Sequence, residues 1–329
     1  MSTPYVYDKY VTTPDYLKKT LDTYGVAIIP SVLTDEECKN MFDGIWDYFE
    51  HITQKWPIPI KRTKQTTWSQ FFDLYPLHSM LVQQWHVGHA QVSWNVRQKE
   101  KIVDIFAKLW NVDKEELLVS FDGLSFGIPP EITKRGWNDG KTWYHTDQSY
   151  TRNEFECIQS WVTALDVNEG DATLSVMEGS HKYHSEFAKK IGVTSESDWY
   201  KLKSYEEEFY VKKGCQYAKI KCPKGSIVFW DSRTIHCGAE PMTTRKTPNF
   251  RAVIYLCYTP RSMATDEHIE RKQSACKGLV TTSHWPHRIN CFPSYPKSRY
   301  GKHIEFKQIV KPKQPILTDL GKKIAGLTK

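Results

Sequence analysis

The chain lacks several features that would by themselves assign it to a class of protein. Its eight cysteines have no paired short spacing and no CxxC motif, so a disulfide framework is not expected. No apolar run approaches the length that spans a bilayer, and the first residues, MSTPYVYDKY, lack the charged-then-apolar order of a secretory signal. There is also no internal repeat and no low-complexity linker. We therefore expect reduced thiols, a cytoplasmic location, no membrane partner and one domain over residues 1–329.

The chain carries a formal net charge of +7, and much of the excess lies between Lys297 and Gln314. A basic surface can serve nucleic acid or phosphorylated ligands, but diffuse lysines without a groove-reading motif are typical of a solvated surface. Nucleic acid is therefore not an expected partner.

Local patterns divide the chain into three parts. Residues 1–116 are predicted to be mostly helical: Thr13-Pro14 indicates a helix start, Thr34 to Glu37 (TDEE) forms a capping box, and residues 98–110 carry apolar side chains at helical spacing. Residues 117–260 contain short β-branched and aromatic runs bounded by turn residues, interrupted by a polar helical insertion at about 183–211. Residues 261–329 are predicted to be a proline-punctuated wrap. The pattern predicts a mainly β fold with flanking helices (α+β), of the sandwich or jelly-roll type.

The segment YHTDQSY, residues 144–150, sets His145 and Asp147 two positions apart. In a strand these side chains leave the same face and form part of a metal site. A third ligand must come from far along the chain, and His236 fits because it follows the apolar strand SIVFWD after a short turn. Two histidines and one carboxylate form the facial triad of non-haem Fe(II) oxygenases.

Oxidative chemistry at such a centre needs electrons, which 2-oxoglutarate can supply while dioxygen takes the last metal position. The far carboxylate of 2-oxoglutarate needs a bidentate cation, for which a guanidinium suits best. Arg251 opens the strand RAVIYLCYT, 15 residues beyond His236, and is the candidate. Arg245 competes for this role, but its polar loop, PMTTRKTP, predicts an exposed side chain.

Four segments together resemble the phytanoyl-CoA dioxygenase-like family of Fe(II)/2-oxoglutarate oxygenases: HTD at 145–147, VTALDVNEGDATLSVMEGSHK at 162–182, KGSIVFWDSRTIHCG at 224–238 and NFRAVIYLCY at 249–258. The order of these segments along the chain is the strong part of the resemblance. The resemblance implies a double-stranded β-helix (a jelly-roll or cupin-like barrel). It also implies iron on His145, Asp147 and His236, and 2-oxoglutarate on Arg251. Because Asp147 is present, hydroxylation is favoured over the halogenation carried out by relatives that lack this carboxylate.

Other residues are candidates for the surroundings of the metal. Gln159, Trp161 and Thr163 alternate on one strand, so Gln159 and Thr163 could reach the 2-oxoglutarate carboxylate at the metal. The candidates for the substrate pocket are Trp143, Gln148, Tyr150, Trp161 and Arg233, although Trp161 could be core and Arg233 could pair with Asp231. His284 and His287, in SHWPHR, have no partner pair for a zinc site and are interpreted as a surface turn.

These patterns predict a dioxygenase that hydroxylates a small molecule with release of succinate and carbon dioxide. Two alternatives stay open: a non-catalytic ligand-binding module on the same barrel, and a zinc hydrolase that uses the same three ligands. The residues do not select the substrate, so an anionic and a CoA-linked compound are both compatible with them.

Overall fold

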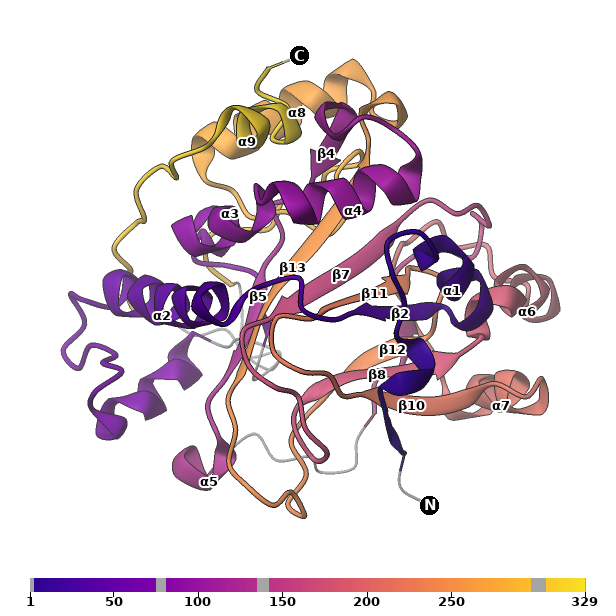
Figure 1. Ribbon diagram of the computed structural model, residues 1–329, viewed down its shortest axis with the longest axis horizontal. Helices are drawn as coiled ribbons and strands as arrows, with labels where there is room; N and C mark the ends of the chain where they lie inside the picture. Colours follow the sequence, from indigo (N-terminus) through magenta and orange to yellow (C-terminus); the bar gives the residue numbers. More distant parts are fainter. Residues whose placement is uncertain (1–2, 75–80, 135–141, 297–305, 329) are drawn as a thin grey trace.

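A computed structural model describes residues 3–74, 81–134, 142–296 and 306–328. Within these residues the strands form two sheets (Figure 1). The first sheet has the strand order β1 (Tyr5–Val6), β10 (Gln216–Ile220), β8 (Thr173–Glu178), β12 (His236–Ala239), β6 (His145–Thr146), β9 (Tyr200–Lys201). The second has the order β2 (Val26–Ile29), β11 (Ile227–Asp231), β7 (Ile158–Thr163), β13 (Arg251–Pro260), β5 (Leu124–Gly127), β3 (Leu81–Val82), with β4 (Leu117–Val119) also paired to β13. The named strands pair antiparallel except β1 with β10, and this arrangement confirms the double-stranded β-helix.

The second sheet is buried on both faces, which explains why its strands are nearly continuous apolar runs. Along β11, Ile227 and Phe229 belong to the core shared with the helices, whereas Val228 and Trp230 belong to the core between the sheets. The alternation follows from the two-residue period of a strand. One face of this sheet is therefore available to line a site between the two sheets.

The N-terminal helices cover the outer face of the second sheet (Figure 1). They are α1 (Leu17–Tyr24), α2 (Asp35–Ile52), α3 (Gln91–Arg97) and α4 (Glu100–Trp110). The predicted capping box is confirmed, because the Glu37 amide donates to Thr34 Oγ1 at 3.2 Å and the Thr34 amide donates to Glu37 Oε2 at 2.9 Å. Helix α1 begins later than predicted, since Thr13 accepts a turn hydrogen bond from the Tyr16 amide instead of capping the helix.

The predicted insertion contains α6 (His184–Ile191) and α7 (Ser204–Lys212), with β9 between them. Strand β9 pairs with β6, so that Lys201 lies opposite His145. A small core of its own, which includes Phe187, Phe209 and Tyr210, holds the insertion against the first sheet. The insertion is thereby attached to the strand that carries the first predicted metal ligand.

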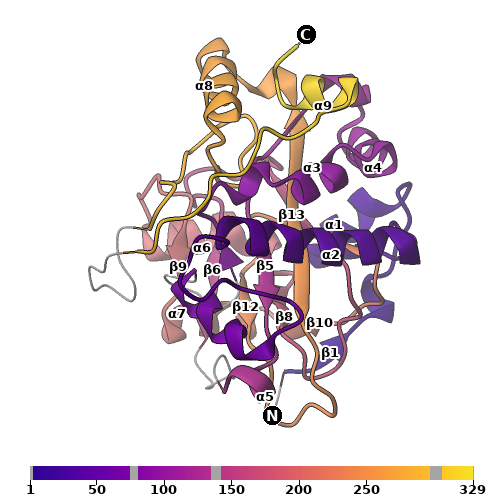
Figure 2. The ribbon, with the colours of Figure 1, turned by 90° about the vertical axis from the view of Figure 1, so that its left-hand side faces the viewer.

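The chain after Pro260 contains a helix that the sequence did not predict, α8 (Asp266–Gly278), and ends in α9 (Asp319–Ile324). Both helices lie at the end of the molecule where β4 lies, on the opposite side from the N-terminus (Figures 1 and 2). Lys272 of α8 is fully buried and donates from Nζ to the carbonyl of Val119 in β4. This contact joins the C-terminal part to the barrel.

The run LLVSFDGLSFGI, residues 117–128, forms two strands, β4 and β5, which are separated by residues 120–123 and have the pair Asp122-Gly123 between them. A Cβ atom at position 123 would overlap the carbonyl of Val82, so only glycine allows the chain to approach β3 at this point. Asp122 therefore lies between the two strands and belongs to neither of them.

In the described structure all eight cysteines are free, as expected, and seven of them are buried. None of the helices in the described part of the chain combines the length and the apolar composition needed to cross a membrane.

Candidate metal and 2-oxoglutarate site

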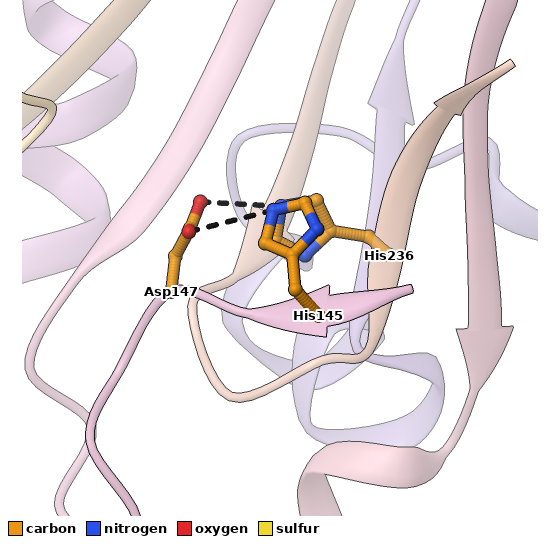
Figure 3. A group of neighbouring side chains, drawn as sticks. All are labelled: His145, Asp147 and His236. Atoms are coloured by element: carbon orange, nitrogen blue, oxygen red, sulfur yellow. Dashed lines mark ion pairs between the residues drawn. The ribbon is translucent and has the colours of Figure 1, made fainter. Parts of the chain in front are cut away.

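His145, Asp147 and His236 converge between the two sheets (Figure 3). Nε2 of His145 lies 3.4 Å from Oδ1 of Asp147, and Nε2 of His236 lies 3.3 Å from Oδ2. The three donor atoms all lie within 4.8 Å of one another. Both rings are nearly buried, each with 4% of its residue surface exposed.

Backbone pairing brings the two histidines together. His145 opens β6 and His236 opens β12, and the two residues are direct partners in the sheet. Each ring donates from Nδ1 to a carbonyl two residues earlier, His145 to Trp143 at 3.0 Å and His236 to Thr234 at 2.8 Å. These bonds select the tautomer whose Nε2 lone pair is free, which is the usual orientation of a metal-binding histidine.

Asp147 is oriented by a side chain of the second sheet and by the two histidine rings. Gln159 of β7 donates from Nε2 to Asp147 Oδ2 at 3.0 Å. Burial by itself would raise the pKa of Asp147, but the charges of His145 and His284 and hydrogen bonds from both ligand histidines hold the pKa well below its usual range. The carboxylate is therefore ionised and available as a ligand.

The donor set fits a divalent metal ion. With both Nδ1 positions bonded to carbonyls, both Nε2 atoms face oxygens of one largely buried carboxylate, and this cluster is stabilised by positive charge, carried either by protons on the rings or by a shared metal ion. Two imidazoles and one carboxylate on one side leave coordination positions for other ligands, which suits Fe(II). The three predicted metal ligands are thus brought together by the fold.

Arg251 opens β13 and lines the same cavity as the triad. The cavity, here called the inner cavity, has a volume of about 130 Å³. The Arg251 guanidinium lies over the ring of Trp161 at 5.3 Å and donates to the Ala172 carbonyl at 3.0 Å. No carboxylate of the described residues forms an ion pair with this buried guanidinium, so its remaining N–H groups fit the far carboxylate of 2-oxoglutarate.

Three of the other predicted residues line the inner cavity: Trp143, Gln159 and Trp161. Trp143 stacks on the His145 ring with 4.7 Å between centroids and 10° between planes. Trp161 supports Arg251, as described above, and Gln159 orients Asp147. These side chains thus contact the triad or Arg251 directly.

Four predicted residues are not among those that line the cavity. The Thr163 hydroxyl, at the end of β7, donates to the Leu165 carbonyl at 2.6 Å and closes a local turn. Gln148 lies beyond β6, and its amide donates to the carbonyls of Arg152 and Glu154. Thr163 is the last residue of β7, and Gln148, selected because it flanks the ligand pair, lies past the end of β6.

The remaining two of these four have partners in other parts of the structure. Tyr150 lies in the core of the insertion, where its hydroxyl is 2.9 Å from that of Tyr210. Arg233 forms a bidentate pair with Asp231 at 2.9 and 2.7 Å, the alternative that its sequence position left open. Arg245, expected to be exposed, is instead buried and paired with Glu131 and Asp171.

The residues that line the inner cavity but were not selected from the sequence as site residues include two with titratable side chains near the triad, Asp122 and His284. Asp122 lies at the break between β4 and β5, where the Asp-Gly pair was a usable turn signal. His284 was interpreted as part of a surface turn, and this interpretation is wrong because the segment after α8 returns to the barrel. His287 is likewise buried, with Nδ1 3.1 Å from the hydroxyl of Thr259.

A second hollow, here called the outer cavity, has a volume of about 620 Å³ and shares Trp143, His145, Asp147 and His284 with the inner one. Its other walls come from residues 196–199 of the insertion and from the segment 283–292. The insertion and the C-terminal segment thus form the approach to the metal site.

The fold and the site together define a non-haem metal centre on a double-stranded β-helix. Residues 21–249 match the phytanoyl-CoA dioxygenase (PhyH) family, and the chain belongs to this family. The matched region includes the three metal ligands and ends two residues before Arg251. Family membership and the donor set confirm the expected dependence on iron and 2-oxoglutarate, with dioxygen as the oxidant.

Comparison with known proteins gives distant relatives. The chain is 27% identical over 212 residues to Ava biosynthesis cluster protein O of Aspergillus versicolor, covering 61% of this chain and 65% of the relative, just under two thirds of its length. A hypothetical protein of Escherichia coli has a TM-score of 0.59 at 12% identity, with 96% of this chain and 85% of that chain covered. The carbocyclase SnoK from nogalamycin biosynthesis, described as non-heme and alpha ketoglutarate dependent, has a TM-score of 0.50 at 17% identity, with 79% and 92% covered. The structural likenesses show the fold.

Proposed function

We propose that the protein is an Fe(II)- and 2-oxoglutarate-dependent oxygenase that hydroxylates a small molecule. One observation carries this proposal: four groups lie around one cavity. They are two histidines whose Nδ1 atoms are hydrogen-bonded to carbonyls, one carboxylate, and a buried arginine that has no carboxylate partner among the described residues. A metal hydrolase needs the first three of these groups but has no use for Arg251. A purely ligand-binding barrel has no need for either set.

Bound iron and 2-oxoglutarate together supply dioxygen activation, with oxidation of the co-substrate to succinate and carbon dioxide. The chain's own residues hold and orient these groups. His145, Asp147 and His236 are the metal ligands, and Gln159 holds one carboxylate oxygen of Asp147 in place. Arg251 binds the far carboxylate of 2-oxoglutarate, and Trp161 supports the guanidinium from one side.

The surroundings favour reaction with a bound substrate over reaction with water. Trp143 stacks on one ligand ring, Trp230 lies 5.5 Å from the other between ring centroids, and Leu174 lines the same cavity. These apolar walls limit the water near the reacting atoms. The relative in a biosynthesis cluster supports a small molecule as substrate.

Hydroxylation is the outcome proposed here, and the carbocyclase SnoK indicates the principal alternative, which is ring closure with loss of two hydrogens. Incubation of the Fe(II)-loaded protein with 2-oxoglutarate and candidate small molecules in air tests both. We expect succinate release to rise with a true substrate, and the product to gain one oxygen atom. Asp147→Ala should abolish the activity, and the surface variant Asp104→Asn is the matched control.

Two results would contradict the proposal. Metal-dependent turnover of an ester or amide without 2-oxoglutarate consumption would favour the zinc hydrolase. Binding of a ligand with no succinate release in the Fe(II)-loaded protein would favour the binding module. A product that has lost two hydrogens would keep the oxygenase class and replace hydroxylation by ring closure.

A further inference from the structure

Asp122 has a buried carboxylate in which one oxygen is hydrogen-bonded and the other receives no hydrogen bond from a described residue. Only 7% of the residue is exposed, and it lines the inner cavity. Oδ1 accepts a hydrogen bond from the Gly123 amide at 2.6 Å, and no described residue donates to Oδ2. Arg97 is nearby, but its guanidinium donates to the main-chain carbonyls of Gly88 and Asp122 and not to the carboxylate.

His284 lies beside Asp122 and is also incompletely bonded. It lines both the inner and the outer cavity, within electrostatic range of the carboxyl groups of Asp122 and Asp147. Its Nε2 atom is buried and has no hydrogen-bond partner among the described residues. A buried polar atom without a partner is costly, so Asp122 and His284 together suit a ligand that donates hydrogen bonds.

The outer cavity is lined by aromatic and acidic side chains. Its aromatic residues are Trp143, Trp199, Trp285 and Phe292. The Trp199 side chain belongs to the insertion, is 52% exposed, and lies 5.9 Å from the His145 ring between centroids. An exposed tryptophan beside a metal ligand provides a flat surface on which another ring can stack.

The cations needed for a phosphorylated substrate are scarce at this site. Among the described residues that line either cavity, two carry a guanidinium group, Arg251 and Arg288, and none is a lysine. The outer wall also contains the carboxylates of Glu196 and Asp198. Arg251 is assigned to 2-oxoglutarate. Arg288 lies 3.6 Å from Glu156, which also pairs with Arg152 at 2.7 Å, so Glu156 offsets the Arg288 charge only in part. A CoA ester would bring several phosphate charges to a site where, among the described lining residues, Arg288 is the remaining guanidinium and no lysine is present.

We infer that the substrate is an aromatic molecule with a basic N–H group, neutral or cationic overall, and not a CoA ester. Its ring lies in the outer cavity beside Trp199, and its nitrogen donates to Asp122 Oδ2 and His284 Nε2 in the inner cavity. The inference rests on the proposed function, because it places this molecule next to the iron and 2-oxoglutarate. It differs from the thioester substrate that the family's name describes.

Three probes that share one ring and differ in charge test the inference: tryptamine, tryptophol and indole-3-propionate. Each is titrated calorimetrically into the anaerobic protein loaded with Fe(II) and 2-oxoglutarate, and benzoyl-CoA serves as the CoA ester. Tryptamine is expected to bind at least about tenfold more tightly than indole-3-propionate, as a charge-assisted hydrogen bond predicts. Benzoyl-CoA is expected not to compete.

Variants of single residues test which side chains cause the preference for tryptamine over indole-3-propionate. Asp122→Asn should remove most of the preference for tryptamine and leave tryptophol affinity nearly unchanged, and His284→Gln should weaken tryptamine binding independently. Asp104→Asn is the charge-matched control on the exposed side of α4. Trp199→Ala should weaken both tryptamine and tryptophol, whereas Tyr205→Ala, which removes a 60% exposed aromatic residue of the same insertion, should not.

Several outcomes would overturn the inference. They are equal or tighter binding of indole-3-propionate or benzoyl-CoA, an unchanged preference in Asp122→Asn, unchanged affinities in Trp199→Ala, and no saturable tryptamine binding below about 10 mM. The visible absorption band of the iron–2-oxoglutarate chelate is recorded on the same samples. If the band forms and the preference is absent, only the substrate inference fails; if no band forms, the proposed function fails as well.

Discussion

The side-chain amide of Gln159 donates to Oδ2 of Asp147 at 3.0 Å, and the same oxygen faces Nε2 of His236 at 3.3 Å. Gln159 lies on β7 of the second sheet, whereas the two histidines lie on β6 and β12 of the first sheet. One hydrogen bond therefore sets the position of the carboxylate ligand relative to ligands held by the other sheet.

Removal of this amide should weaken metal binding. Gln159→Leu is expected to lower the affinity for Fe(II) by about 10- to 100-fold, because groups that orient metal ligands commonly contribute this much. Competition with a metal-sensitive dye under anaerobic conditions measures the effect, and Gln54→Leu, an exposed position after α2, is the control. Equal affinities in the two variants would show that the amide does not position Asp147.

Arg251 should control the affinity for 2-oxoglutarate and not that for iron. Arg251→Ala leaves the far carboxylate of the co-substrate without its bidentate partner, so we expect the dissociation constant to rise by at least about tenfold. Arg251→Lys should recover only part of the loss, because an ammonium cannot make the paired contact. The exposed Arg271→Ala is the matched control, and an unchanged 2-oxoglutarate affinity in Arg251→Ala would refute this assignment.

Arg233 should behave as a structural residue. Its bidentate partner Asp231 has a side chain that is 3% exposed, so Arg233→Ala leaves a buried carboxylate unpaired. The loss is expected to lower the free energy of unfolding by about 3 kcal/mol. Denaturant titration measures this effect, and 2-oxoglutarate affinity in the folded variant should match wild type. A large loss of 2-oxoglutarate affinity with normal stability would contradict this prediction and indicate that Arg233 belongs to the binding site.

Lys272 should make stability depend on pH above neutrality. Complete burial lowers the pKa of Lys272 from 10.5 to about 7 in the folded protein. Between these values the unfolded chain binds a proton at Lys272 that the folded chain does not, so the Lys272 contribution to the free energy of unfolding rises with pH across this window.

Denaturant titrations at pH 7 and at about pH 8 measure this contribution as the difference between wild type and Lys272→Met, because unfolded cysteines ionise above this range while the buried thiols do not. Lys272→Met removes the titrating group and should lower the slope of stability against pH. The exposed Lys277→Met, five residues later on α8, should retain the wild-type slope. Identical slopes in wild type and Lys272→Met would contradict the prediction.

Much of the site could be predicted because it depends on strand periodicity. Gln159 and Trp161 alternate inward on β7, and Arg251 begins the long strand β13. His145 and Asp147 face the same site as their two-residue spacing predicts, although Asp147 lies one residue past the end of β6. Each of these positions follows from short-range sequence patterns. The third ligand, His236, was found because it follows the apolar strand SIVFWD after a short turn, and the order of the motifs along the chain supported it.

Prediction failed where the strand pattern ends or where a distant segment arrives. Thr163 continues the alternation of β7, yet it is the last residue of the strand and its hydroxyl closes a turn. Gln148 follows β6 and folds back onto its own loop. Periodicity gives no information beyond the end of a strand, so these side chains could not be placed from sequence.

The contributions of Asp122 and His284 depend on tertiary packing. Asp122 was hidden in an apolar run, and the close approach of Gly123 to β3 is what breaks that run. His284 reaches the cavity because the segment after α8 passes over the barrel opening, and no local motif in SHWPHR indicates that path. These are also the two residues on which the substrate inference depends.

The most direct test of the central claim is an anaerobic titration of the Fe(II)-loaded protein with 2-oxoglutarate, monitored by visible absorption. We expect a saturable charge-transfer band from the chelate. The band should be lost in His236→Ala and be retained in His51→Ala, a histidine near the end of α2 and outside both cavities. Iron that binds with normal affinity and gives no band with 2-oxoglutarate would contradict the account.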